Sequence, residues 1–316
     1  MADRVDDLLS CELPIQLAPM GSVSATASLP LAVAAAGGHG MYPALALPPA
    51  ALEPILDALA AQTQAFGVNF LVPFMDRGSL ELAISRAPYV DFFLGDADPA
   101  LVELVRAGGA VCGWQVESPH EARAAEAAGC QLVVAKAWES GGRKRIEGPT
   151  LLALLDGVLD AVGVPVVAAG GIATARGVAA ALAAGADGVR VGTRFIAAEE
   201  SDAHPAWVRA LIDAAAEDAV VSDAYNVGLP QPGPHRVLRS SIEAAESLAE
   251  GEEVGVIRLA GAEIPVVRFA ANPPTRESTG TIEAMPFYAG QSAGAVRKVQ
   301  PAAEIVAELA VGVRSG

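Results

Sequence analysis

The feature that most constrains the fold is an alternation of short apolar runs with longer helix-type runs over residues 14–196. The short runs are Val-rich and nearly continuous in apolarity, as expected of strands covered on both faces. Eight candidate strands occur: PIQLAP, HGMYPAL, FGVNFLVPF, YVDFFLG, AVCGWQV, LVVAKA, VPVVAAGG and GVRVGTRFI. Each is followed by a helix or lies near one, which predicts an α/β fold of the (β/α)8 TIM-barrel class. A doubly wound open sheet has the same alternation and is the alternative.

Hydroxyl residues mark the starts of several predicted helices. Ser24, Ser118 and Thr174 each precede a helix-type run. A side-chain oxygen at such a position accepts a hydrogen bond from a free backbone N–H of the first turn.

The alternation changes character after residue 200. We predict a barrel domain over residues 1–218, an inserted small α+β subdomain over residues 219–290, and a final helix over residues 291–316 that packs back on the barrel. Proline-rich stretches at 230–234 and 272–274 mark loops of the insertion.

The charge and composition limit the classes of molecule that the protein can bind. The net charge of −16 argues against nucleic acid, because phosphate binding relies on Lys and Arg. The sequence contains no run of about eighteen uninterrupted apolar residues, so we expect no membrane span. The acidic start MADRVDDLLSCELP lacks the layout of a secretory signal. Cys11, Cys112 and Cys130 are scattered, which fits a reduced, cytoplasmic protein with Cys112 and Cys130 in its core. We expect a small-molecule partner; the oligomeric state stays open, with a homodimer as one alternative.

One dense basic cluster interrupts this acidic background. Arg143, Lys144 and Arg145 follow the sixth strand in the stretch WESGGRKR. A locally basic site on an acidic protein suits a small anionic ligand better than a polyanion.

Glycine turns follow the seventh and eighth strands. Gly170-Gly171 ends VPVVAAGG, and Gly192-Thr193 lies within GVRVGTRF. Glycine lets backbone N–H groups approach an anion closely, and these two loops form the usual phosphate cradle of a TIM barrel. The alternative is that the glycines only permit a turn.

Longer motifs resemble a known family. LAPMGSVSATASLPLAVAAAGGHGM, FGVNF, EARAAEAAGCQLVVAKAWESGG, VPVVAAGGIATARGVAAALAAGADGVRVGTRFIAAEESDAHPAW and FYAGQSAG occur in family order between residues 13 and 313. Together they resemble the nitronate monooxygenase (2-nitropropane dioxygenase) family. That family comprises FMN-dependent TIM barrels and is similar to the flavin-dependent enoyl-acyl-carrier-protein reductases. The resemblance implies non-covalent FMN and no metal.

The resemblance also implies positions for the cofactor. Gly170, Gly171, Gly192 and Thr193 would hold the FMN phosphate, and Ala18, Pro19 and Met20 would lie against the isoalloxazine. Asn69 would hydrogen-bond the flavin, with a strand-end cap as its alternative reading. Gln291 would lie near the cofactor, with a surface loop as the alternative.

Lys136 departs from the family pattern. The family usually carries Gln or Glu at this strand, followed by Gly, whereas this chain reads VVAKAWESGG. A buried Lys needs a partner. We predict that Lys136 offsets negative charge at the N1/C2 carbonyl edge of the flavin; the structural alternative is an ion pair with Glu139 or Asp91.

The larger departure lies at position 143. Related enzymes typically show Glu, a small residue, Gly-Gly and then His, but this chain reads Glu139-Ser140-Gly141-Gly142-Arg143. An Arg cannot exchange protons near neutral pH, although it binds carboxylates and nitronates bidentately. We therefore predict a substrate site formed by Glu139, Ser140, Gly142 and Arg143, with Arg143 as the anion holder.

The four histidines offer a replacement for the missing proton carrier. His39, in AGGHGMY, would serve if its segment folded over the barrel mouth, and a turn histidine with a structural hydrogen bond is the alternative. His120 and His204, at helix starts, and His235, in a Pro-rich loop, read as structural or surface residues.

These features predict an FMN-dependent oxidoreductase of the nitronate monooxygenase type, which oxidises a small anionic substrate with O2 as acceptor. The first alternative is an NAD(P)H-dependent flavin reductase acting on an enoyl thioester or a quinone. A second is a flavin-binding homologue without nitronate activity, because Arg143 stands in place of His. A third is a non-redox isomerase that binds a phosphate.

Overall fold

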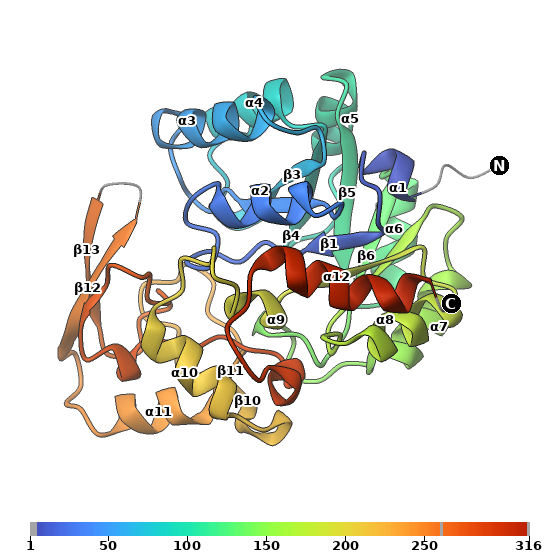
Figure 1. Cartoon of the computed structure of the whole chain (residues 1–316). Helices are drawn as coiled ribbons and strands as arrows, with labels where there is room; N and C mark the ends of the chain where they lie inside the picture. Colours follow the sequence, from blue (N-terminus) through green and yellow to red (C-terminus); the bar gives the residue numbers. More distant parts are fainter. Residues whose placement is uncertain (1–4, 260–261, 315–316) are drawn as a thin grey trace.

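The computed structural model describes residues 5–259 and 262–314. Eight parallel strands form one sheet in the order β1-β9-β8-β6-β5-β4-β3-β2 (Figure 1). Their bounds are β1 (Ile15–Leu17), β2 (Gly40–Pro43), β3 (Phe66–Leu71), β4 (Tyr89–Phe93), β5 (Val111–Val116), β6 (Leu132–Lys136), β8 (Val166–Ala169) and β9 (Gly188–Val191).

The two end strands of this sheet meet each other. Gln16 in β1 bridges His39 just before β2, and the Leu17 N–H donates to the His39 carbonyl at 2.9 Å. This contact joins the sheet edges into a barrel. The predicted (β/α)8 class is therefore confirmed, and the open doubly wound sheet is wrong.

Helices surround the barrel. They are α2 (Ser28–Ala35), α3 (Pro49–Ala60), α4 (Arg77–Arg86), α5 (Pro99–Ala107), α6 (Pro119–Ala127), α7 (Leu151–Leu159), α8 (Ala175–Ala183) and, from the end of the chain, α12 (Ala302–Val313). Figure 1 shows α12 lying across the barrel beside α8. This crossing is close, since a Cβ at Gly312 would lie 2.1 Å from the Ala175 carbonyl oxygen.

Two of the three predicted helix caps are confirmed. The Ser118 and Thr174 hydroxyls each accept a bond of 3.2 Å from the backbone N–H three residues ahead. The prediction for Ser24 is wrong, because α2 begins only at Ser28 and the Ser24 hydroxyl is buried without a hydrogen bond. Cys112 and Cys130 lie in the core, as predicted.

The amino end of the barrel is filled by apolar side chains. Met41, Tyr89, Leu132, Val134 and Val167 pack together with Val5 and Leu9 beside the short helix α1 (Val5–Leu8). The barrel interior is thus closed at this end, so a ligand site belongs at the carboxyl ends of the strands.

The remaining elements attach to one side of the mouth. A three-stranded sheet contains β10 (Ala219–Ser222), β11 (His235–Leu238) and β7 (Gly142–Arg143). Because β7 belongs to the loop after β6, this sheet ties residues 219–238 to the barrel mouth. The other elements are α9 (Thr193–Ile196), α10 (Pro205–Asp213), α11 (Arg239–Glu246), β12 (Glu253–Leu259), β13 (Ala262–Val267) and β14 (Thr279–Gly280). The β12–β13 hairpin projects from the body (Figure 1).

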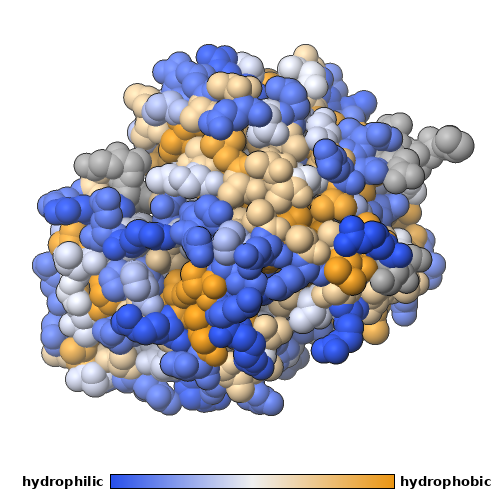
Figure 2. Space-filling view, viewed as in Figure 1, coloured by the Kyte–Doolittle hydropathy of each residue, from blue (hydrophilic) through white to orange (hydrophobic). Residues whose placement is uncertain are grey.

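The surface is mixed in character. Figure 2 shows hydrophilic residues over most of the viewed face, with smaller apolar areas between them. Among the described residues, no helix combines the length and apolar character that a membrane crossing needs.

Candidate active site

Two glycine turns meet at the carboxyl ends of β8 and β9. Gly170 and Gly171 follow β8 in the left-handed region, at φ 105° and 74°, which only glycine adopts without strain. A Cβ at Gly170 would lie 3.2 Å from the Ala137 carbonyl oxygen. At the neighbouring turn, a Cβ at Gly192 would lie 3.1 Å from the Ala18 Cβ. Both turns are therefore tightly packed where a side chain would begin, and as glycines they present backbone.

A late segment of the chain crosses the loop after β6 at the same place. A Cβ at Gly290 would lie 2.7 Å from the Glu139 carbonyl oxygen, and a Cβ at Gly141 would lie 2.7 Å from the Gly290 nitrogen. The Gln291 N–H donates to the Glu139 carbonyl at 2.9 Å, and the Gly290 N–H donates to the Thr193 hydroxyl at 2.9 Å. This segment thus connects the loops that follow β6 and β9.

Glu139 and Ser140 carry polar atoms with no partner in the described part of the chain. The Glu139 Oε1 accepts from the Leu151 N–H at 3.0 Å and so caps α7, but its Oε2 is buried and unbonded. The Ser140 hydroxyl is also buried and unbonded. Ser140 adjoins the glycine turn, since a Cβ at Gly170 would lie 3.2 Å from its nitrogen. Orphaned polar atoms of this kind call for an explanation, and a bound polar ligand is one.

A cavity of about 440 Å³ opens beside this junction. Gly171, Thr174, Gln291, Ser292 and Arg297 contribute to its lining. Gln291 therefore lines a cavity instead of standing on a plain surface loop.

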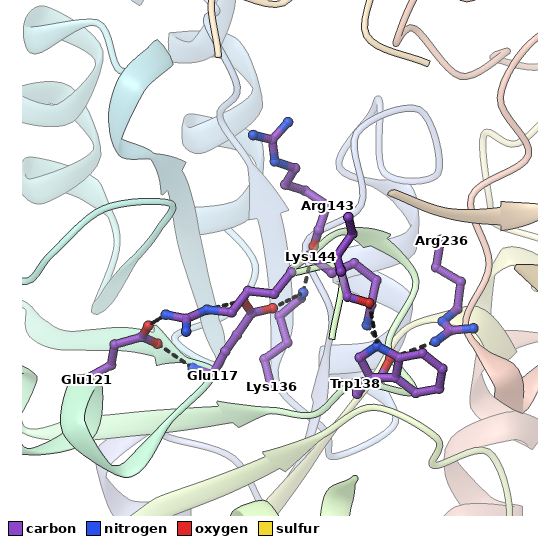
Figure 3. Close-up of polar contacts among 9 residues, drawn as sticks. Glu117, Glu121, Lys136, Trp138, Arg143, Lys144 and Arg236 are labelled. Atoms are coloured by element: carbon purple, nitrogen blue, oxygen red, sulfur yellow. Dashed lines mark hydrogen bonds and ion pairs between the residues drawn. The ribbon is translucent and has the colours of Figure 1, made fainter. Parts of the chain in front are cut away.

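Lys136, the last residue of β6, points into the barrel mouth. Its Nζ donates to the Glu117 Oε1 at 3.1 Å and to the Arg143 carbonyl at 2.7 Å, and it lies 4.6 Å from the centre of the Phe93 ring (Figure 3). The side chain is 10% exposed. Burial lowers the pKa of Lys136, and the Glu117 carboxylate opposes that shift. The ion-pair partner is thus Glu117, and the predicted alternatives, Glu139 and Asp91, are wrong.

The side chains of Arg143, Lys144 and Arg145 lie in different environments. Arg145 pairs with Glu117 at 3.5 Å and with Glu121. Lys144 is buried, and its Nζ donates to the Trp138 carbonyl. These two side chains hold the loop after β6 and leave Arg143 as the member available to a ligand.

Arg236, from the neighbouring strand β11, covers Lys144 together with Trp138. Its guanidinium lies 4.2 Å from the centre of the Trp138 ring, and its Nη2 donates to the Trp138 carbonyl at 3.0 Å (Figure 3). Burial, followed by the charges of Lys136 and Arg236, lowers the pKa of Lys144 to about 7.

Arg143 is half-buried at the edge of the mouth. Its Nη2 donates to the Pro232 carbonyl at 3.0 Å, and its backbone pairs with β11. Figure 3 shows its side chain directed away from Lys136 and Glu117. Burial lowers the pKa of Arg143, but a guanidinium remains charged at neutral pH.

A polar chain crosses the barrel interior below the mouth. The Asn69 Nδ2 donates to the Asp91 Oδ1 at 2.7 Å, and the Asp91 Oδ2 lies 2.6 Å from the Arg190 Nη2. The Arg190 Nε donates to the Gln16 Oε1 at 2.6 Å, and the Gln16 Nε2 lies 3.0 Å from the His39 Nδ1. Asn69 is therefore fixed at the upper end of a buried network.

His39 lies at the other end of that network. It precedes β2 at the amino end of the barrel and is fully buried, and burial, followed by the Arg190 charge, lowers its pKa to about 3. The prediction that His39 folds over the mouth and moves a proton there is therefore corrected: its ring makes the structural hydrogen bond to Gln16.

His235 is the functional candidate that sequence reasoning missed. It opens β11 directly opposite Arg143 and is only 5% exposed, so the reading as a residue of a Pro-rich loop is wrong. The pairing joins residues more than 90 positions apart through a two-residue strand. No local pattern in the sequence signals such a contact.

The comparisons with known proteins agree with this architecture. The family model described as nitronate monooxygenase matches residues 62–312. A protein of Mycobacterium tuberculosis named (3aS,4S,5R,7aS)-5-hydroxy-7a-methyl-1-oxo-octahydro-1H-indene-4-carboxyl-CoA dehydrogenase is 35% identical over 250 residues, which is 78% of this chain. The alignments cover 68% of that protein and 65% of its namesake from Rhodococcus jostii, so the chain spans about two thirds of these relatives.

Two solved structures share nearly the whole fold. FabK from Thermotoga maritima superposes with a TM-score of 0.77 at 29% identity, over 99% of this chain and 97% of that chain. Nitroalkane oxidase from Streptomyces ansochromogenes superposes with a TM-score of 0.76 at 28% identity, over 98% of this chain and 99% of that chain. The barrel, the glycine turns and the family match together assign this chain to the nitronate monooxygenase family, a family of oxidoreductases.

Proposed function

We propose that the chain is an FMN-dependent oxidoreductase of the nitronate monooxygenase type, which oxidises a small anionic substrate with O2 as acceptor. The observation that carries this proposal is the junction of the two glycine turns with the unbonded Ser140 hydroxyl. Backbone N–H groups at the carboxyl ends of the seventh and eighth barrel strands, beside a free hydroxyl from the loop after the sixth, suit a phosphate ester.

The FMN phosphate would lie on Gly170, Gly171, Gly192 and Thr193. The Thr193 oxygen already accepts from the Gly290 N–H, so its own proton is available for a phosphate oxygen. Ser140 supplies a further hydroxyl at the same junction. When bound, FMN would supply the electron-transfer chemistry, which no side chain provides.

The flavin ring would lie nearer the barrel axis. Ala18, Pro19 and Met20 follow β1 beside Gly192, with the Met20 sulfur 3.3 Å from a Cβ placed there. Asn69 and Gln291 are the candidate hydrogen-bonding residues. Asn69 lies within β3, and Gln291 lies in the late segment that crosses the loop after β6.

Lys136 is proposed to place a positive charge under the flavin's N1/C2 edge. Its pairing with Glu117 and with the Arg143 carbonyl fixes the ammonium group at the mouth. A fixed cation favours the developing negative charge more than a mobile one, because little reorganisation is needed.

Arg143 is proposed to bind the anionic group of the substrate, beside Glu139 and Gly142 of the same loop. One of its N–H groups is used by the Pro232 carbonyl. A guanidinium has five donors, so a carboxylate or nitronate can still bind to it bidentately.

A second candidate substrate class is an acyl-CoA thioester. The Mycobacterium tuberculosis relative at 35% identity is named as a dehydrogenase of a carboxyl-CoA compound. The same Arg143 would then face the thioester carbonyl or a CoA phosphate. NAD(P)H as a reductant belongs to a separate alternative, a flavin reductase that acts on an enoyl thioester or a quinone.

Anaerobic mixing of the FMN-loaded protein separates these candidates. A nitronate is expected to bleach the flavin absorption, and O2 is expected to restore it. Bleaching by a CoA thioester alone would favour the second candidate, and bleaching by NADH or NADPH alone would favour a reductase. No bleaching with any of them would contradict the proposed oxidoreductase activity.

A further inference from the structure

His235 and Arg143 form a direct cross-strand pair. The antiparallel register joins His235 of β11 to Arg143 of β7. Side chains of directly opposed residues lie on the same face of a sheet, about 5 Å apart at Cβ. The imidazole therefore accompanies the guanidinium at the edge of the mouth.

The His235 ring has an unused nitrogen. The residue is 5% exposed, and its Nδ1 is buried without a hydrogen bond among the described residues. The ring lies 5.4 Å from the Tyr288 ring, but the Tyr288 hydroxyl donates to the Ala271 carbonyl at 2.9 Å. A buried nitrogen with no partner is costly in a stable fold, so it points to a ligand that completes it.

Burial and the neighbouring cations keep the His235 ring neutral. Burial, followed by the charges of Arg143 and Lys136, lowers its pKa to about 4, and a backbone interaction with Gly233 opposes this shift. Tyr288 is the other titratable group in contact, and burial raises the pKa of that phenol. At neutral pH the ring is therefore in the form that accepts a proton.

We propose that His235 is the catalytic base of this active site, and that Arg143 holds the negative charge which the proton transfer creates. This inference rests on the proposed function, because the proton transfer forms, from a neutral nitro or carbonyl compound, the anion that the same site then oxidises. His235 would carry the proton, which Arg143 cannot do because a guanidinium does not release its proton at neutral pH.

The step balances without an oxidant. The proton of a C–H bond next to a nitro or carbonyl group moves to the His235 Nδ1, so the C–H bond breaks and an N–H bond forms. The electron pair moves onto the nitro or carbonyl oxygen, where the Arg143 guanidinium neutralises it. That neutralisation also weakens the repulsion between Arg143 and the protonated ring. The ring then returns the proton to carbon or to solvent.

Hydrogen exchange of nitroethane in D2O tests this step apart from redox turnover. The FMN-loaded protein is kept anaerobic, and loss of the α-proton signal is followed by NMR against a protein-free buffer. We expect H235Q to lose about 10²–10⁴-fold of the protein-dependent rate, the usual contribution of a general base. The matched control H120Q, at an exposed position of α6, is expected to retain it.

Rescue distinguishes proton transfer from a structural role. R143H in the H235Q background restores an imidazole one strand away and is expected to recover part of the exchange. If H235Q does not fold, the wild-type protein provides the second test. Ethyl nitronate should then shift the His235 ring resonances in the NMR spectrum.

Three results would overturn the inference: wild-type exchange no faster than buffer, H235Q exchange at the wild-type rate, or unshifted His235 resonances with ethyl nitronate. The visible spectrum of the same samples separates the two proposals. If the protein shows no flavin absorption but its hydrogen exchange still depends on His235, the FMN proposal is rejected and the proposal that His235 is a catalytic base is retained.

Discussion

Gly290 packs backbone against backbone on Gly141, close enough that a Cβ at Gly290 would lie 3.0 Å from the Gly141 nitrogen and 2.7 Å from the Glu139 carbonyl oxygen. The Gly290 N–H also donates to the Thr193 hydroxyl at 2.9 Å. A segment from the end of the chain thereby fixes two loops of the barrel mouth. The geometry of the proposed FMN site depends on this crossing.

Replacing Gly290 by Ala tests the crossing. The added methyl group meets backbone that cannot rotate away, so we expect G290A to lose about 1–3 kcal/mol of stability and to bind FMN more weakly. Thermal unfolding and FMN fluorescence titration measure both. G148A, in the loop after β6 that Gly290 packs against, is the matched control, because a Cβ there meets the Trp138 side chain at an ordinary 3.6 Å. Equal behaviour of the two variants would contradict the proposed role of Gly290.

Much of this site could be predicted from the sequence, because its glycine turns are local. Gly170-Gly171 and Gly192 directly follow apolar strands, and the requirement for glycine arises within a few residues. His235 could not be predicted in the same way. Its position depends on pairing with a two-residue strand far away along the chain.

The burial of Lys144 also depends on a contact between segments far apart in the chain. A Lys in the run Arg143-Lys144-Arg145 would suit a solvated rim, but the side chain is buried under Arg236 and Trp138. Arg236 comes from β11, so the burial depends on the same long-range pairing. For Lys136, the partner Glu117 follows the adjacent strand β5, and no helix or strand periodicity specified that choice over Glu139 or Asp91.

Lys144 predicts a pH dependence of stability. Its folded-state pKa is lowered to about 7 from its usual 10.5. Between these values the unfolded chain binds more protons than the folded protein, so this residue makes stability rise with pH from about 7 toward 10. Below pH 7 both states are protonated, and its effect is constant. We expect chemical denaturation of K144M to lack this rise, and the same slope in K144M and wild type would contradict the assignment.

Lys136 is expected to raise the reduction potential of the bound flavin. Replacing it by Met keeps most of the volume and removes the cation over the mouth. We expect K136M to bind FMN yet to have a lower flavin reduction potential, because the fixed positive charge that favours the reduced form is lost. Potentiometric titration checks this. R77A, which removes an exposed Arg paired with Glu81 on α4, serves as the control. An unchanged potential in K136M would remove Lys136 from the cofactor site.

Arg143 predicts an effect on substrate binding. We expect R143A to raise the KM for an anionic nitronate by about 10–100-fold, the loss of one charge-assisted hydrogen bond or pair. Steady-state kinetics with a nitronate measures the change. R143K retains charge without the planar fork and is expected to fall between R143A and wild type. An R143A variant with wild-type KM would show that the anion binds elsewhere.

We propose that the two glycine turns hold the phosphate of FMN. Fluorescence titration with FMN and with riboflavin, which lacks only that phosphate, tests this contact. We predict that FMN binds about 100-fold more tightly, as expected for two or more charge-assisted hydrogen bonds from backbone and hydroxyl donors. Equal affinities for FMN and riboflavin, or no binding of either, would contradict it.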